Sequence, residues 1–233
     1  MSSDITLAFL GHSAWRILHG DYDILIDPFI TGNPVATVTA DQLDPTHIIL
    51  THGHGDHLGD AIGIGSRGKA QVISTFEVAN YVRGRGCADA VGMGIGGAHN
   101  FNFGRVKFTI AHHSSSAPDG TYLGNPAGVV ITIGGRSIYH AGDTALFLDM
   151  QLIGSRDHLD VALLPIGDYF TMGVKDAVTA AEFLMPDLVI PMHYDTFPPI
   201  KVDAEDFRSR LEEKGIRCAV LRPGESHTIP AGA

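Results

Sequence analysis

The sequence of 233 residues has only two cysteines and no long hydrophobic run. Cys87 and Cys218 form neither a C-x-x-C pair nor a zinc-ribbon spacing, so a disulfide framework or cysteine metal site is not expected. No apolar stretch reaches the roughly 18 residues that a transmembrane helix needs. The N-terminus also lacks the basic start and apolar stretch of a signal peptide. We therefore expect a cytoplasmic protein that does not engage a membrane.

Basic residues are scarce as well. Lys and Arg number 16 against 26 Asp and Glu, which gives a formal net charge of -10, and no basic run stands out locally. Such a surface repels phosphate backbones, so nucleic acid is not an expected partner. Divalent ions bound in a site would still attract an anionic small molecule, and such a substrate remains compatible with the net charge.

The remaining composition suits one domain of mixed α/β structure. Hydrophobic residues make up 44% of the chain, and no Pro- or Ser-rich linker divides it, so residues 1–233 are predicted to form a single domain. The 28 glycines indicate many tight turns. Periodicity predicts strands at 5–10, 14–18, 24–27, 48–51, 71–74, 161–165 and 188–191, hairpins with turns near 104 and at 134–135, and helices at 60–66, 75–83, 146–153, 176–184 and 204–214.

The outstanding motif is THGHGDHLG, which directly follows the apolar strand. It supplies four potential metal ligands within six residues: His52, His54, Asp56 and His57. Imidazole and carboxylate together suit zinc, manganese or iron, and the intervening glycines let these side chains converge. The alternative is a His-rich surface loop that binds nothing. H-x-H-x-D-H after a buried strand is more typical of a metal site.

Further candidate ligands follow downstream. His112 and His113 end the apolar stretch of FTIAHH, and because neighbours in a strand point to opposite faces, only one of them can enter a shared site. Asp143 in YHAGDT could instead cap a helix. His193 in VIPMHYDTFP could be a buried structural histidine, and Asp27 in ILIDPF could simply begin a turn.

Taken in order, these motifs resemble those of the metallo-β-lactamase superfamily over almost the whole chain. GHSAW, IDPFITGNP, THGHGDHLGD, YHAGDTALF, PIGDYFTMG and PMHYDTFP are similar to a branch of predicted metal-dependent hydrolases related to the ascorbate-6-phosphate lactonases. The resemblance implies an α/β fold of four layers, an αββα sandwich. In this fold two mixed β-sheets pack face to face, with helices on the outer faces.

The resemblance also implies a dinuclear site of five histidines and two aspartates, with zinc as the first expectation and manganese or iron as alternatives. The first ion would be held by three histidines, namely His52, His54 and His113. The second would be held by Asp56, His57 and His193. Asp143 would bridge the two ions, and Asp27 would brace the ligand loop by hydrogen bonds without touching metal.

Other residues are candidates for catalysis or substrate binding. Asp56 is placed to orient the nucleophilic water or to take its proton. His140, three residues before Asp143, could orient the site or meet the substrate, with a structural role equally open. Asn125 and Thr171 lie in loops that resemble the family's cleft rim, and His12 in LGHS is a further candidate for substrate contact.

Two divalent ions held close together can share a water, lower its pKa and present hydroxide to carbon or phosphorus. This predicts hydrolysis of a small, anionic ester, lactone or phosphodiester. A catalytically idle metal-binding scaffold or regulator is one alternative. A thioester hydrolase of the glyoxalase II type is another, although no C-terminal helical substrate domain is visible. Homo-oligomerisation stays open.

Overall fold

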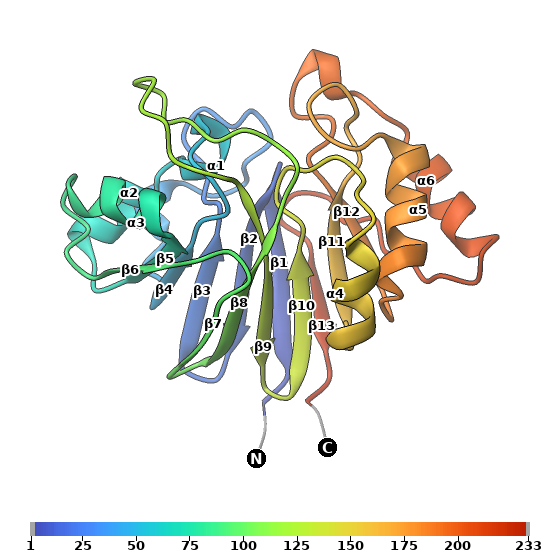
Figure 1. Ribbon diagram of the computed structural model, residues 1–233, viewed down its shortest axis with the longest axis horizontal. Coiled ribbons are helices and arrows are strands. Elements are labelled where there is room, and N and C mark those ends of the chain that lie inside the picture. The colour runs from blue at the N-terminus through green and yellow to red at the C-terminus, as the bar shows by residue number, and fades with distance from the viewer. Residues whose placement is uncertain (1–2, 232–233) are drawn as a thin grey trace.

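Two β-sheets form the centre of the molecule in the computed structural model, which describes residues 3–231 (Figure 1). The first sheet has the strand order β13-β1-β2-β3-β4-β5-β6 and the second has the order β12-β11-β10-β9-β8-β7. The strands of the first sheet are β1 (Ile5–Gly11), β2 (Ala14–His19), β3 (Tyr22–Ile26), β4 (His47–Ile49), β5 (Gln71–Thr75), β6 (Ala90–Met93) and β13 (Ser226–Ile229). The strands of the second are β7 (Ala98–Phe101), β8 (Gly104–Ile110), β9 (Ala127–Ile133), β10 (Arg136–His140), β11 (Val161–Pro165) and β12 (Val189–Met192).

Both sheets change from antiparallel to parallel pairing. Strands β1 to β3 pair antiparallel and β3 to β6 pair parallel. In the second sheet β7 to β10 are antiparallel, and β10 to β12 are parallel. Parallel neighbours need crossover connections, and helices provide them. The crossovers contain α1 (Gly55–Leu58), α2 (Ala61–Arg67), α3 (Phe76–Arg83), α4 (Met150–Arg156) and α5 (Val174–Leu184), and α6 (Ala204–Glu212) contacts α5.

Three apolar layers hold this four-layer αββα sandwich together. Alternate residues of each strand point inward, so Leu7 and Phe108 belong to one core cluster between the two sheets. The outer face of the first sheet packs on α2 and α3 in a second cluster, which includes Val72 and Val78. The outer face of the second sheet packs on α4, α5 and α6 in a third cluster, which includes Leu164 and Phe207. Strands covered on both faces must be apolar throughout, which is the reason for the continuous hydrophobic run at 48–50.

Most predicted elements are confirmed, and the differences fall where the local pattern is weak. Helix α4 begins at Met150, four residues after the predicted start, because 143–149 form a loop. Strands β6 and β13 were not predicted. β13 is largely polar, and it forms by pairing Ile229 with Ile5 at the other end of the chain. The prediction that His112 and His113 lie in a strand is wrong, because β8 ends at Ile110.

The parallel strands of both sheets end at the same edge of the sandwich, the upper edge in Figure 1. The segments that follow β3, β4, β8, β10 and β12 therefore lie close together there, and they carry the predicted ligands, with Asp56 and His57 in α1. Within residues 3–231, no helix is long and apolar enough to span a membrane.

Candidate metal centre

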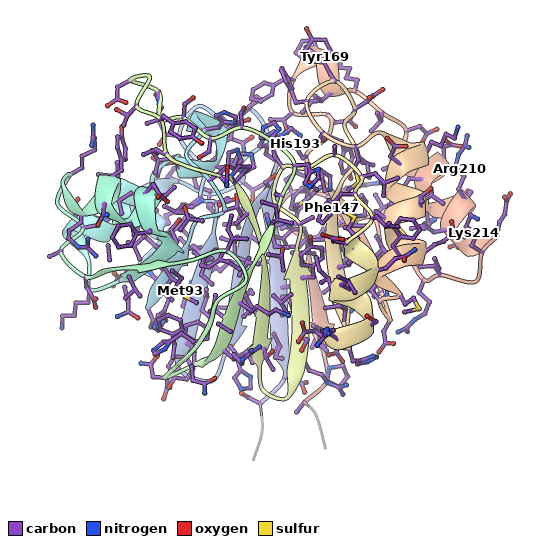
Figure 2. The ribbon with its side chains drawn as sticks, in the orientation of Figure 1. Met93, Phe147, Tyr169, His193, Arg210 and Lys214 are labelled. Atoms are coloured by element: carbon purple, nitrogen blue, oxygen red, sulfur yellow. The ribbon has the colours of Figure 1, made fainter. Side chains whose placement is uncertain are left out.

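The predicted ligands form two adjacent clusters at this edge. The nitrogens of His52, His54 and His113 lie within 4.8 Å of one another, and so do ligand atoms of a second group. The second group consists of Asp56, His57, His193 and His12. Figure 2 shows His193 above the ends of the strands.

Asp143 lies between the two clusters. Its Oδ1 is 3.1 Å from His57 Nε2, and its Oδ2 is 3.1 Å from His193 Nε2. The same Oδ2 is 3.6 Å from His113 Nε2, which belongs to the first cluster. One carboxylate thus reaches both groups, which is the geometry that a bridging ligand requires.

The loop after β8 turns His113 toward the first cluster and His112 away from it. His113 Nε2 lies 3.3 Å from His54 Nδ1, and His54 Nδ1 lies 3.0 Å from His52 Nε2. His112 is exposed and stacks on Phe147 with ring centroids 4.7 Å apart. Only His113 faces the cluster.

Asp27 is fully buried and braces the ligand loop by three hydrogen bonds. Its Oδ1 accepts the backbone N–H of Thr51 at 2.8 Å. Its Oδ2 accepts the Thr51 hydroxyl at 2.6 Å and the Nδ1–H of His57 at 2.8 Å. Because the Thr51 hydroxyl is used as a donor, its oxygen accepts from His52 Nδ1 at 3.0 Å. Both rings therefore turn Nε2 toward the centre, the nitrogen that would bind a metal ion once it carries no proton.

Several atoms in the centre lack a hydrogen-bond partner. They are His57 Nε2, Asp143 Oδ1 and both ring nitrogens of His193. Although His57 and Asp143 approach to 3.1 Å, their orientation forms no hydrogen bond. Buried polar atoms left unpaired cost about 1–3 kcal/mol each. A cation bound by these atoms would remove that cost, so the residues fit a divalent metal ion. Imidazole together with carboxylate suits zinc, manganese or iron.

Buried charges shift the pKa values of these groups. Burial opposes protonation of His57, but the carboxylates of Asp143 and Asp27 outweigh it and raise the pKa of His57 well above its ordinary value. Burial would raise the pKa of Asp143, yet the rings of His193 and His57 hold it well below its ordinary value. Burial lowers the pKa of His52 strongly, which keeps this ring in the neutral form that binds metal.

Two of the candidate residues, His140 and His12, are buried and hydrogen-bonded. His140, a candidate catalytic residue, is fully buried, and both its ring nitrogens bond the backbone: Nε2 to Ser13 O at 3.0 Å and Nδ1 to Gly142 N at 3.1 Å. It has no free nitrogen for proton transfer, and instead it ties the β1–β2 turn to the loop of Asp143. His12, a candidate substrate contact, is also fully buried and bonds Asp56 and Thr196.

The remaining rim candidates stay predictions. Asn125 is exposed in the loop between β8 and β9 that also carries His113. Thr171 is half-buried, and its hydroxyl donates to the carbonyl of Met172 at 3.4 Å. Two structural residues, Thr51 and Thr196, were not singled out from the sequence, because a threonine next to a ligand motif carries no distinctive signal.

Close packing between the loops requires glycine at Gly142. Its φ is 62°, and a Cβ there would lie 2.5 Å from the carbonyl oxygen of Ala127 and 3.2 Å from Thr51 Cβ. The loop of Asp143 can therefore reach the loop of the H-x-H-x-D-H motif only without a side chain at this position.

The fold and the site together define a protein of the metallo-β-lactamase type. Residues 6–193 match a family model described as "Beta-lactamase superfamily domain". The chain is 51% identical to the UPF0173 metal-dependent hydrolase TTHA1283 of Thermus thermophilus, covering 95% of this chain and 97% of the relative. A UPF0173 metal-dependent hydrolase of Geobacillus thermodenitrificans is also 51% identical, covering 94% and 98%.

A solved structure agrees with these relatives. Igni18, described as a novel metallo hydrolase from Ignicoccus hospitalis, has a TM-score of 0.89 and 37% identity, covering 97% of this chain and 98% of that one. This chain therefore belongs to the UPF0173 metal-dependent hydrolases of the β-lactamase superfamily. The predicted fold and enzyme class are confirmed.

Proposed function

We propose that this chain hydrolyses a small, anionic ester, lactone or phosphodiester at a centre that holds two divalent metal ions, with zinc first and manganese or iron as alternatives. The observation that carries the proposal is the Asp143 carboxylate, which lies within 3.6 Å of ring nitrogens from both histidine clusters. His52, His54 and His113 would hold one ion. Asp56, His57 and His193 would hold the other, with Asp143 shared.

When bound, the two ions supply a water of lowered pKa and stabilise the charge that develops on the substrate oxygen. Asp56 is the residue suited to that water. Its side chain is 32% exposed, whereas that of Asp143 is 3% exposed, so solvent and substrate can reach it. Burial would raise the pKa of Asp56, but the hydrogen bond from His12 outweighs it and lowers the pKa. The carboxylate stays ionised and can orient the water or take its proton.

Substrate would be recognised by the loops around this opening. Asn125 and Thr171 supply polar groups, and Tyr169 and Phe170 are exposed by 73% and 50% on the loop between β11 and α5. That loop is anchored next to Asp143 because the Met172 N–H donates to the Thr144 carbonyl at 3.0 Å. Tyr169 stands at the outermost point of this end (Figure 2). We propose that the aromatic pair contacts an apolar part of the substrate.

A reducing compartment such as the cytoplasm fits the cysteines. Cys87 is buried, Cys218 is half-buried, and both are free thiols. Free thiols of this kind are typical of proteins that work where disulfides do not form.

The proposal is tested by metal content and turnover measured on the same samples. Protein purified without chelator should contain about two ions per chain, and His193→Ala and Asp143→Ala should each contain fewer. The parent should hydrolyse aryl phosphodiesters or lactones, and both variants should lose most of that activity. His112→Ala is the matched control, because this ring faces away from the cluster.

Other outcomes identify the alternatives. Two ions without turnover of any phosphodiester, lactone or ester would favour the idle scaffold. Preferential turnover of a glutathione thioester would favour the glyoxalase II type. One ion or none, unchanged in both variants, would refute the ligand assignment.

A further inference from the structure

His12 occupies an unusual position in the turn between β1 and β2. Its backbone has φ 61°, and Gly11 before it has φ 105°. Left-handed backbone is unfavourable for a residue with a side chain, so it persists only where the surroundings require it. The side chain of His12 is fully buried, which excludes a direct role at the solvent-facing rim.

Both ring nitrogens of His12 have a partner. Nε2 lies 3.1 Å from Asp56 Oδ2, and Nδ1 lies 3.0 Å from Thr196 Oγ1. A carboxylate can only accept, so Nε2 carries the proton, and Nδ1 then accepts from the Thr196 hydroxyl. Thr196 lies in the segment after β12, and Asp56 lies in α1, in the segment after β4. One imidazole therefore joins two segments that follow strands of different sheets.

The backbone of the same residue holds His193. The carbonyl of His12 accepts the N–H of His193 at 2.8 Å, and the two rings lie 4.0 Å apart between centroids. His193 is itself left-handed, with φ 55°. His12 thus fixes two of the three residues assigned to the second ion, one by its ring and one by its backbone.

We propose that His12 is a positioning residue that holds the Asp56 carboxylate in place for the second ion and the nucleophilic water. The inference rests on the dinuclear site proposed above and adds a residue that acts through Asp56. It assigns Asp56 Oδ2 to the hydrogen bond with His12 and leaves the other oxygen to the ion or the water. Thr196 secures the proton of His12 on Nε2.

The test uses full-length protein stripped of metal and titrated with Zn²⁺ by calorimetry, with Co²⁺ absorption as a spectroscopic check. His12→Gly removes the ring without backbone strain, because glycine adopts positive φ freely. His12→Gln restores an N–H donor that can reach Asp56 but is a poor metal ligand. Ser13→Ala is the matched control from the same turn, since the Ser13 hydroxyl is buried without a partner.

The expected result is selective. His12→Gly should weaken the binding of one ion by about 10–100-fold and leave the other unchanged, as is typical when the hydrogen-bond partner of a ligand is removed. His12→Gln should recover most of this affinity, Thr196→Val should lie between, and Ser13→Ala should match the parent. The Co²⁺ spectrum should change in His12→Gly and return in His12→Gln.

Three results would overturn the proposal: parent affinity for both ions in His12→Gly, equal weakening of both ions, or no recovery in His12→Gln. The last would indicate that His12 is itself a ligand. If His12→Gly does not fold, Thr196→Val decides, because parent affinity in that variant also overturns the proposal. Fewer than two ions in the parent would instead count against the dinuclear site itself.

Discussion

Replacement of Asp27 by asparagine removes the charge that organises the ligand loop while leaving its shape intact. Asp27 has φ 45°, a conformation that asparagine tolerates better than most residues, so Asp27→Asn adds little backbone strain. The amide oxygen can still accept the Thr51 N–H. The amide NH₂, however, faces two groups that now donate to Oδ2, the Thr51 hydroxyl and His57 Nδ1–H. The N–H donors of the amide would then face the O–H and N–H donors of Thr51 and His57, and neither hydrogen bond could form.

The magnitude follows from these two hydrogen bonds. Hydrogen bonds to charged groups contribute about 1.5–3 kcal/mol, so the metal-free protein should lose roughly 3 kcal/mol of its free energy of unfolding. In a chain of this size about 1 kcal/mol shifts Tm by about 2–4 °C, which predicts a Tm lower by roughly 6–12 °C. Loss of the ligand orientation should weaken binding of the ion held by His57 by about 10–100-fold.

The assay is thermal unfolding in chelator together with Zn²⁺ titration. Asp60→Asn is the control, because Asp60 Oδ2 also accepts two hydrogen bonds, from the N–H groups of Ile30 and Thr31, but lies outside the clusters. This variant should lose stability without losing metal affinity. If Asp27→Asn binds both ions as tightly as the parent, the idea that Asp27 fixes the protonation of His57 is refuted.

Three further predictions follow from the same geometry. In the metal-free protein, protonated His57 stabilises the fold fully below pH 6.5, and this stabilisation is lost as the pH rises through the higher pKa of His57 in the folded state. Ionised Asp143 stabilises the fold above pH 3.8, and that stabilisation is lost as the pH falls through the lower pKa of Asp143 in the folded state. Tm in chelator should therefore fall as the pH is raised above 6.5, and a flat profile would contradict the pairing. His113→Ala should lose about one Zn²⁺ per chain by elemental analysis and His112→Ala none, and the reverse would exchange their assignments. Gly142→Ala should lower the free energy of unfolding by at least about 2 kcal/mol in denaturant titration, because the added Cβ meets backbone at a positive φ; a stable variant would show that the loop can shift.

Local pattern was enough to predict most of the fold and the centre of the site. Alternating and continuous apolar runs mark strands, so β11 was predicted with its bounds, Val161–Pro165. The H-x-H-x-D-H segment places its side chains together because they are close in the chain and follow a strand end. Asp143 and His193 were identifiable only because the order of motifs resembles a known superfamily.

Tertiary structure decided the features that depend on distant residues. His113 rather than His112 enters the centre because the loop after β8 packs over the motif loop, where the Ser115 hydroxyl accepts the Gly53 N–H at 3.1 Å. The partners of His12 and His140 could not be predicted because they are remote: Thr196 is 184 residues from His12, and Ser13 is 127 residues from His140. Strand register brings these groups to one edge of the sandwich. A ring nitrogen that is already bonded to such a remote partner cannot also serve substrate, and only the packed molecule shows which nitrogens are bonded.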